Sequence, residues 1–292
     1  MDLAVIGLGL MGGTLARHLL ADGHAVVGFD PEAERAGEHA GRGGVVASSV
    51  AEAVAGVEVA LLSLPNSSVM LEVVHEIASS TRDGLLVVDT TTGEPDDAVA
   101  AWRALAEAGA DFVDATISGN AAQAAVRDVI FMAGGSQEAV AVATTLLRPL
   151  GRAVYHVGPV GSGAIAKLIV NHVLSINRAA VAEGLTVAEK AGVDLEEMLL
   201  ILRDSAAYSK AMDIWGDRMV AADHYPPSSR VRQSHKDSRL INGFAESVGA
   251  SHVLADAVRR ALVDAEDGGL SDADNSSVME VMRRRAGIGR HE

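Results

Sequence analysis

Three glycines near the start of the chain have the spacing of a loop that binds a dinucleotide. Gly7, Gly9 and Gly12 lie in the sequence IGLGLMGG and form the pattern G-x-G-x-x-G. The first glycine permits a tight turn, the second lets a pyrophosphate approach the backbone, and the third lets helix and strand pack closely. A turn without a ligand is the alternative, but an apolar run before the motif and a helical pattern after it favour the dinucleotide. The loop also includes Leu8, Leu10 and Met11.

An acidic residue lies where the adenosine ribose of the cofactor would be recognised. Asp30 ends the next apolar run, 18 residues after Gly12. A carboxylate in this place accepts hydrogen bonds from both ribose hydroxyls of NAD and repels the 2′-phosphate of NADP. The nearest basic residue is Arg35, which a solvated helix position explains equally well. We therefore expect NAD as the cofactor, with NADP less favoured.

A lysine and an asparagine in the middle of the chain have the spacing for acid–base chemistry. The sequence GSGAIAKLIVNH at Gly161–His172 places Lys167 and Asn171 four residues apart, on one face of a helix. Lys167 lies among apolar residues, and desolvation lowers the pKa of a lysine toward the range useful for proton transfer. The alternative is a lysine whose stem covers apolar surface while its charge stays in water.

Three further motifs complete a pattern that extends over nearly the whole chain. They are DTTTGEP at Asp89–Pro95, DATISGNAAQAAVRDVIFMAGG at Asp114–Gly135, and HKDSRLI at His235–Ile241. With GLGLMG and the lysine motif, in this order and spacing, they resemble the β-hydroxyacid dehydrogenase family. That family includes 3-hydroxyisobutyrate dehydrogenase, tartronate semialdehyde reductase and, more distantly, 6-phosphogluconate dehydrogenase.

The resemblance implies roles for individual residues. Lys167 is the implied general acid and base, and Asn171 orients the substrate. Ser118, Gly119 and Asn120 would hold the substrate's carboxylate, because a hydroxyl beside backbone N–H groups suits an anion; an ordinary turn is the alternative. Further implied cofactor contacts are Leu64, Pro65, Thr92 and Lys236, and Lys236 would also bind substrate. Without the resemblance, Thr90 and Thr91 are expected to cap a helix, and Lys236 with Asp237 to form a solvated charge pair.

The substrate motif departs from the family's pattern, so the sequence does not name the hydroxy acid. Asn120 replaces a glycine, and we expect it to keep the loop's shape because asparagine tolerates left-handed backbone angles. Its side chain is then expected to enter the site. The other departures are Thr116 and Ala121 in place of prolines, Gln123 in place of a glycine, and Arg127 with Asp128 in place of a pair such as Gly-Thr.

The elements that must position these residues fall into two groups. Up to residue 160, short β-branched runs alternate with amphipathic stretches, which predicts parallel βαβ units in a doubly wound, Rossmann-type sheet. Strands are expected at 3–6, 25–29, 45–46, 57–64, 85–89, 111–114, 129–133 and 151–158, and helices at 11–22, 49–55, 95–108 and from 137. Later helices are expected at 163–191, 195–203, 210–221, 234–249, 253–265 and 276–285. The prediction is an α/β NAD-binding domain, 1–160, and an all-α domain for substrate and oligomerisation, 161–292, joined by a long helix.

Composition excludes several classes of function. The 292 residues are 49% hydrophobic and carry a formal net charge of −15, which argues against nucleic-acid binding. There are no cysteines, so disulfides and thiolate metal sites are excluded, and the scattered histidines suggest no metal site. No apolar run reaches ~20 residues, so we expect no membrane span. With no signal peptide recognised, we expect a cytoplasmic protein. An apolar stripe on 163–191 predicts a homodimer or homotetramer.

The sequence thus predicts an oxidoreductase that transfers hydride between NAD and the β-carbon of a small 3-hydroxy acid or its semialdehyde. Three alternatives stay open. An oxidative decarboxylase like 6-phosphogluconate dehydrogenase would need a larger helical domain and a phosphate-binding arginine cluster. An imine reductase shares the architecture but usually loses the lysine and prefers NADP. A non-catalytic NAD-binding protein would be expected to lose Lys167 or Asn171, and both are present.

Overall fold

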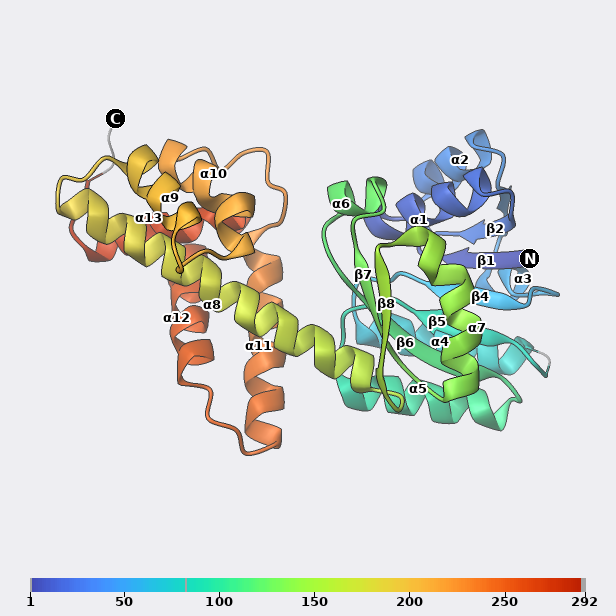
Figure 1. The fold of residues 1–292 in the computed structure, drawn as a ribbon. Coiled ribbons are helices and arrows are strands. Elements are labelled where there is room, and N and C mark those ends of the chain that lie inside the picture. The colour runs from blue at the N-terminus through green and yellow to red at the C-terminus, as the bar shows by residue number, and fades with distance from the viewer. Residues whose placement is uncertain (1, 82, 290–292) are drawn as a thin grey trace. The chain divides into compact units, whose positions relative to one another are not determined.

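The computed structural model describes residues 2–81 and 83–289, which form two compact units. The first unit is Met1–Lys167 and the second is Leu168–Glu292. Figure 1 shows the sheet of the first unit and the helices of the second. Among the described residues, no helix combines the length and the apolar character needed to cross a membrane.

The first unit is built on one eight-stranded sheet with the strand order β3-β2-β1-β4-β5-β6-β7-β8. The expectation of a doubly wound α/β sheet followed by a helical region is confirmed. The strands are β1 Asp2–Ile6, β2 Ala25–Phe29, β3 Val45–Val46, β4 Val59–Leu62, β5 Leu86–Asp89, β6 Asp111–Ser118, β7 Ile130–Gly134 and β8 Ala153–Gly158. β6 is longer than the sequence pattern predicts, so Ser118 ends a strand.

One strand pair departs from the expected parallel arrangement. β6 and β7 are antiparallel, whereas the other neighbouring strands pair in parallel. Only eleven residues, 119–129, connect them. A parallel crossover needs about a dozen residues or more, so this short connection turns the chain back beside the strand that it has just left.

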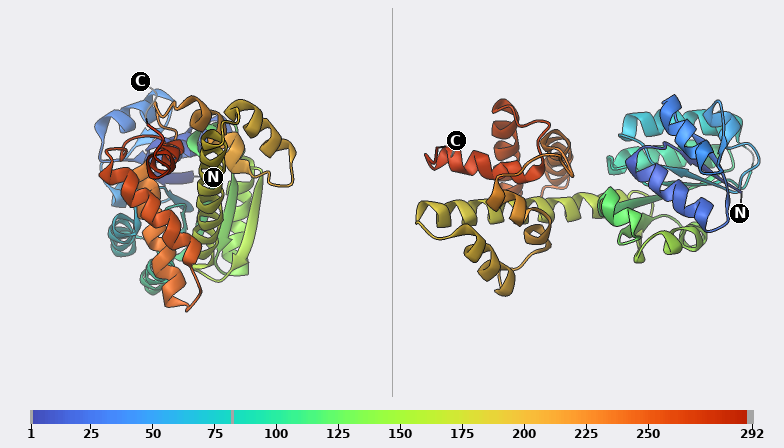
Figure 2. Two further views of the ribbon diagram at one scale, coloured as in Figure 1. Left: turned by 90° about the vertical axis from the view of Figure 1, so that its left-hand side faces the viewer. Right: turned by 90° about the horizontal axis from the view of Figure 1, so that it is seen from above.

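Helices cover both faces of the sheet (Figure 2). Because successive side chains on a strand point to opposite faces, Leu3 and Val5 pack with helices α1 and α7 while Ala4 and Ile6 pack with α3, α4 and α5. The helices of this unit are α1 Leu10–Ala21, α2 Ala33–Gly41, α3 Val50–Ala53, α4 Ser67–Ser80, α5 Pro95–Glu107, α6 Ala121–Ala125 and α7 Gln137–Leu147. Three of them, α2, α4 and α6, were not predicted from the sequence pattern.

The second unit contains helices alone among its described residues. They are the remainder of α8 Ser162–Lys190, then α9 Leu195–Asp204, α10 Asp217–Ala221, α11 Val231–Ser247, α12 Val253–Asp267 and α13 Val278–Arg285, with a π-helical turn at Met212–Gly216. Leu185, Leu199 and Trp215 contribute to its largest apolar core. The long helix starts within one residue of its predicted position.

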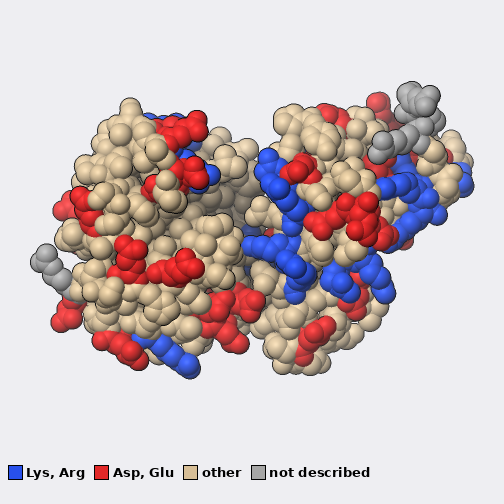
Figure 3. Space-filling model, turned by 180° about the vertical axis from the view of Figure 1, so that it is seen from behind, with Lys and Arg blue, Asp and Glu red and all other residues tan. Residues whose placement is uncertain are grey.

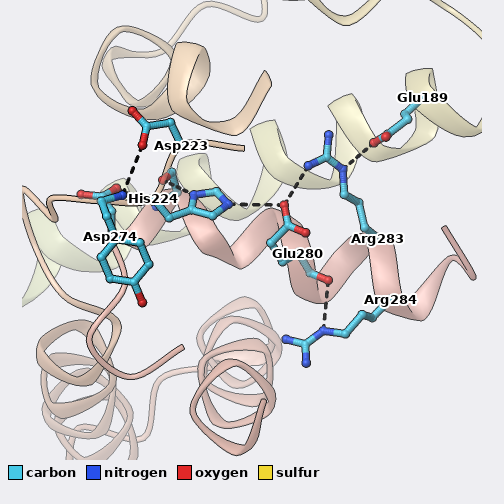
Figure 4. Close-up of polar contacts among 9 residues, drawn as sticks. Glu189, Asp223, His224, Asp274, Glu280, Arg283 and Arg284 are labelled. Carbon is cyan, nitrogen blue, oxygen red and sulfur yellow. Dashed lines mark hydrogen bonds and ion pairs between the residues drawn. The ribbon is translucent and has the colours of Figure 1, made fainter. Parts of the chain in front are cut away.

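A polar network joins three segments of the helical unit (Figure 4). His224 Nδ1 lies 2.9 Å from Ser276 Oγ, and its Nε2 lies 3.3 Å from Glu280 Oε1. Arg283 donates to Glu280 at 2.7 Å and to Glu189 at 2.6 Å. The hydrogen bond from His224, supported by Arg283, lowers the pKa of Glu280 to about 2. Arg283 therefore ties α13 to Glu189 on α8, and the Glu280 carboxylate ties α13 to the segment at His224.

Candidate active site

The glycine loop connects β1 to α1, and its backbone leaves no room for larger residues at two positions. Gly7 has φ +89°, and a Cβ on it would collide with the carbonyl oxygen of Ser63. A Cβ on Gly12 would collide with the carbonyl oxygen of Gly7, which shows how closely α1 approaches the strand. By contrast, a Cβ on Gly9 would meet no heavy atom within 4 Å. This open space at the N-terminus of α1 suits an approaching phosphate group.

Asp30 links the end of β2 to the glycine loop. Its Oδ2 accepts the N–H of Leu8 at 2.8 Å and its Oδ1 accepts the N–H of Glu32 at 2.9 Å. The side chain is 3% exposed, and Arg35 Nη1 lies 3.4 Å from its Oδ2. The two backbone bonds hold the carboxylate still, so its position relative to the loop is set before any ligand arrives.

A cavity of about 540 Å³ lies between the glycine loop, α1 and α2. Gly9, Leu10 and Thr14 line it on one side. Three arginines, Arg17, Arg35 and Arg42, line it as well, together with two glutamates. From the sequence only Arg35 was expected near Asp30, because α2, the helix that Arg42 follows, was not predicted.

Thr90 and Thr91, which follow β5, connect the ends of strands. The expectation that they cap a helix is therefore wrong. Thr90 Oγ1 donates to the carbonyl oxygen of Leu62 at 2.7 Å, and Thr91 Oγ1 accepts the N–H of Leu64 at 3.1 Å. Helix α5 is capped at Glu94, which makes no side-chain cap bond. Thr90 and Thr91 therefore position the segment at Leu64 and Pro65, while Thr92 follows them, partly buried, at the carboxyl end of the sheet.

Two buried carboxylates lie side by side on neighbouring strands. Asp89 on β5 pairs in register with Asp114 on β6. Burial raises the pKa of Asp89 to about 7, against the opposing effect of its hydrogen bonds with Thr91, and the Asp114 carboxylate adds to the rise. Burial also raises the pKa of Asp114 to about 6, although backbone N–H groups of Gly161 and Ala164 donate to it.

The expected substrate loop has a different shape from the one foreseen. Gly119 takes the positive φ, +141°, whereas Asn120 is extended at φ −100°, so the left-handed conformation expected of Asn120 is wrong. Asn120 Oδ1 accepts the N–H of Gln123 at 2.9 Å, and Gln123 Oε1 accepts the N–H of Asn120 at 3.1 Å. This capping box starts α6. It turns the carbonyl end of the Asn120 side chain toward α6 and explains why Gln123 accompanies Asn120.

The first turns of α8 bring Lys167 to the end of β6. Lys167 Nζ donates to the carbonyl oxygen of Ile117 at 2.5 Å. That peptide group leads directly into Ser118, so the ammonium lies beside the residue predicted to hold the substrate's carboxylate. A lysine whose charged head extends into water, the alternative reading of the sequence, would not make this hydrogen bond.

Asn171 lies one turn further along α8, in the helical unit, where it contacts α11. Its Nδ2 donates to Asp237 Oδ2 at 3.3 Å, and Lys236 Nζ lies 3.8 Å from Asp237 Oδ1. The Lys236 and Asp237 side chains are 29% and 20% exposed. The charge pair expected without the resemblance is present, but both of its side chains are only partly exposed. Asp237 is a polar partner of Asn171 that was not among the predicted site residues. Its position directly after Lys236 in the sequence could have indicated it.

Charge is unevenly divided along the chain. Residues 1–167 contain 9 Lys and Arg against 20 Asp and Glu, whereas residues 168–292 contain 15 against 19. On the face shown in Figure 3, Lys and Arg gather on the helical unit. Among the residues that the structure describes, no group of three or more His, Asp or Glu side chains has the arrangement of a metal site.

Both parts of the chain match families of known dehydrogenases. Residues 2–158 match the family described as the NAD binding domain of 6-phosphogluconate dehydrogenase. Residues 161–282 match the family described as NAD-binding of NADP-dependent 3-hydroxyisobutyrate dehydrogenase. The chain belongs to the β-hydroxyacid dehydrogenase family. It is therefore an oxidoreductase that acts on CH–OH groups with a nicotinamide dinucleotide, as the sequence predicts.

Individual relatives agree with this assignment. The 3-hydroxyisobutyrate dehydrogenase of Pseudomonas aeruginosa is 30% identical, over 97% of this chain and 98% of its own. The structure of Mycobacterium tuberculosis 3-hydroxyisobutyrate dehydrogenase with L-serine is 27% identical with a TM-score of 0.89, covering 97% of this chain and 99% of that one. An imine reductase from Pseudomonas sp. is 22% identical with a TM-score of 0.63, covering 96% of this chain and 99% of that one. It shares the fold and is the more distant match.

Proposed function

We propose that this β-hydroxyacid dehydrogenase transfers hydride between NAD and the β-carbon of a small 3-hydroxy acid, with Lys167 as the general acid and base. The observation that carries the proposal is the contact between Lys167 Nζ and the carbonyl oxygen of Ile117, next to Ser118. It brings the proton carrier and the proposed carboxylate anchor to one strand end. The relative solved with L-serine supports the substrate class, because serine is itself a 3-hydroxy acid.

Each residue of the proposed site has a defined task. Ser118 and Gly119 bind the substrate's carboxylate with a hydroxyl and backbone N–H, and Asn120 contributes its amide, because its carbonyl oxygen already caps α6. In oxidation, neutral Lys167 accepts the proton of the β-hydroxyl; in reduction, its ammonium returns that proton to the forming alkoxide. Asn171 orients the substrate, and Lys236 contacts both substrate and cofactor. When bound, NAD supplies the hydride acceptor.

The cofactor fits the glycine loop, and Asp30 favours NAD over NADP. Gly9 leaves the space that a pyrophosphate needs. The backbone from Leu8 to Met11 borders this space. The ordered carboxylate of Asp30 suits ribose hydroxyls and repels an added phosphate. Further contacts come from Leu64, Pro65, Thr92 and Lys236. Residues 1–160 thus form the NAD-binding domain, and 161–292 the domain for substrate and oligomerisation.

We also propose that the enzyme is a cytoplasmic homodimer or homotetramer. Ile169, Val173 and Val187 on α8 are each at least half exposed in the isolated chain. Apolar side chains on one long helix gain by burial against a second copy. Light scattering of the purified enzyme should give two or four times the 30.1 kDa chain mass, and a monomeric mass would contradict this.

Replacing Lys167 tests the proposed mechanism. Loss of a general acid–base group costs about 10²–10⁴-fold in rate, so Lys167→Ala should lower kcat by that factor while NAD binding, measured by calorimetry, stays intact. Lys167→Arg should be nearly as impaired, because a guanidinium stays protonated and cannot accept a proton. The assay should compare several 3-hydroxy acids, each with NAD and NADP.

Lys190 offers a matched control on the same helix. Its Nζ also donates to a backbone carbonyl, that of Ala286 at 2.9 Å, but it lies at the far end of α8. Lys190→Ala should keep kcat within about twofold of the unmodified enzyme. Substantial turnover by Lys167→Arg would exclude Lys167 as the base and would return the imine-reductase and binding-protein alternatives to consideration.

A further inference from the structure

We propose that Asp114 and Thr116 are positioning residues that clamp the first turns of α8 onto β6 and thereby set where the Lys167 ammonium lies. The inference rests on the proposed function, since it assigns to these two residues the placement of its proton carrier. Neither residue belongs to the predicted site, and every contact that carries the inference lies within the first unit.

The carboxylate of Asp114 holds the beginning of the helix. Its Oδ1 accepts the N–H of Gly161 at 2.9 Å and its Oδ2 accepts the N–H of Ala164 at 2.8 Å. N–H groups at a helix start have no partner within the helix, and a negative charge there is favourable. Asp114 is 2% exposed. The bonds that hold the start of α8 are therefore made in the interior of the unit.

The hydroxyl of Thr116 adds a second attachment. Thr116 Oγ1 donates to the carbonyl oxygen of Gly163 at 2.7 Å, and the residue is 1% exposed. A Cβ on Gly163 would collide with the carbonyl oxygen of Asp114, so the backbones of α8 and β6 are in close contact here. The family pattern has proline in place of Thr116, and proline has no hydroxyl. This attachment is therefore a feature of the present chain.

The clamp acts on Lys167 through one helical turn. Gly163 and Lys167 are four residues apart and share a helix face. Lys167 Nζ reaches the carbonyl oxygen of Ile117, the residue that follows Thr116 on β6. Any shift of the α8 start along β6 moves the ammonium relative to Ser118 by a similar amount. A misplacement of ~1 Å can cost about 10²-fold in rate, so the clamp controls proton transfer without touching substrate.

Two substitutions at Thr116 separate its hydroxyl from its bulk. Thr116→Val keeps the shape and removes the hydrogen bond; we expect kcat to fall about 10-fold while KM for NAD stays within about twofold. Thr116→Ser keeps a hydroxyl and should recover most of kcat. One limb of the pH–rate profile should disappear in Lys167→Ala, because it reports the ionisation of Lys167. The apparent pKa of this limb should shift in Thr116→Val and should stay unchanged in Thr116→Ser. Asp114→Asn should likewise lower kcat and leave KM for NAD nearly unchanged, because the amide nitrogen of asparagine cannot accept the second N–H.

A buried threonine elsewhere on α8 provides the control. Thr186 Oγ1 donates to the carbonyl oxygen of Ala182 at 2.7 Å, with 4% of the residue exposed, and lies about 28 Å along the helix from Lys167. Thr186→Val should leave kcat and the pH profile unchanged. The clamp is overturned if Thr116→Val behaves as the unmodified enzyme, or if Thr116→Ser or Thr186→Val is as impaired as Thr116→Val. Turnover by Lys167→Ala would instead overturn the proposed function, whatever the Thr116 variants show.

Discussion

Single side chains in this enzyme are held by bonds that the sequence does not reveal. Asp30 was singled out for its spacing from the glycines, and the structure shows what its oxygens do before a cofactor binds. They accept the N–H groups of Leu8 and Glu32. The residue proposed to select the cofactor thus also holds the glycine loop through Leu8, and a substitution has to separate these two tasks.

Asp30→Asn makes that separation. The amide keeps one oxygen for the Leu8 N–H and loses the charge that repels a 2′-phosphate. We expect the unmodified enzyme to prefer NAD by at least ~10-fold in kcat/KM, about 1.4 kcal/mol, and the variant to lose most of this preference. Nearby Arg17, Arg35 and Arg42 would then favour the phosphate.

The measurement is kcat/KM for NAD and for NADP with the same hydroxy acid. A thermal melt of Asp30→Asn shows whether the loop survives. Arg103→Ala, on helix α5, removes a positive charge elsewhere on the same unit and should not change the ratio. An unmodified enzyme that prefers NADP would show that the assignment of Asp30 is wrong.

At the scale of elements, the short segment between β6 and β7 explains several departures from the family's pattern together. Asn120 and Gln123 start α6, and Arg127 lies just after it with φ +60°. This left-handed region disfavours residues with a side chain, and the family's pattern has glycine there. Arg127 offsets the strain by bonds of 2.7 Å to Asp22 and to the carbonyl oxygen of Pro149.

Substituting Arg127 should expose the strain. Arg127→Ala loses both bonds and keeps the strained backbone, whereas Arg127→Gly loses the bonds and relaxes the backbone. We therefore expect the glycine variant to be more stable than the alanine variant by about 1 kcal/mol. Urea denaturation of the two variants gives this difference directly. An alanine variant as stable as the glycine variant would contradict strain at this position.

The paired carboxylates of β5 and β6 predict a pH dependence of stability. The pKa of Asp89 is raised from 3.8 to about 7 in the folded protein. Its stabilising contribution is complete below pH 3.8 and is lost as the pH rises through about 7, because folding then has to bury the ionised group. Asp89→Asn keeps an oxygen for the Thr91 N–H and removes this ionisation.

We expect Asp89→Asn to gain stability relative to the unmodified enzyme between pH 5 and pH 8, by about 2 kcal/mol. Denaturant unfolding of both proteins at the two pH values measures it. Because both proteins share the other titrating groups, the contributions of those groups largely cancel in the difference between the two unfolding free energies. A difference in unfolding free energy that is the same at both pH values would show that Asp89 ionises normally in the folded protein.

At the scale of the whole molecule, the two units are held by different forces. The sheet unit has apolar cores on both faces, whereas the helical unit combines its apolar cores with a network of partly buried charges. Each unit also contains one tryptophan. Trp102 lies in α5 and is 40% exposed, while Trp215 is buried among the helices at 5%. Fluorescence can therefore follow the helical unit by itself in a Trp102→Phe background.

Glu280→Gln should destabilise the helical unit and leave the NAD-binding unit unchanged. It removes the charge between His224 and Arg283, and hydrogen bonds to charged groups of this partly buried kind contribute about 1.5–3 kcal/mol. The pKa of Glu280 lies near 2, so its contribution is complete above pH 4.5 and is lost as the pH falls through about 2. The difference between Glu280→Gln and the unmodified protein should therefore shrink in strong acid.

Trp215 fluorescence during urea unfolding measures this loss, and calorimetry with NAD tests the other unit. Glu246→Gln is the control, because Glu246 on α11 is 67% exposed and its partner is His252, the residue just before α12. Equal loss of NAD affinity and of helical stability would show that the two units do not behave separately.

Much of the architecture follows from local patterns. Strand and helix positions, the glycine loop and the start of α8 near Gly163 are encoded by residues close together in the chain, because burial periodicity and glycine punctuation are local signals. The composition and the motif order were also sufficient to predict the family and its fold, which the comparisons confirm. The predicted roles of Lys167, Asn171 and Ser118 await the experiments above.

Only the tertiary structure decided which distant groups meet. The sequence predicted that a helix begins near Gly163, but not that Asp114 and Thr116 hold it, nor that Thr90 and Thr91 join two strand ends. These contacts depend on strand order and on the antiparallel turn into β7. Long-range pairing reflects the packing of the whole sheet, and one residue's neighbours along the chain carry little information about it.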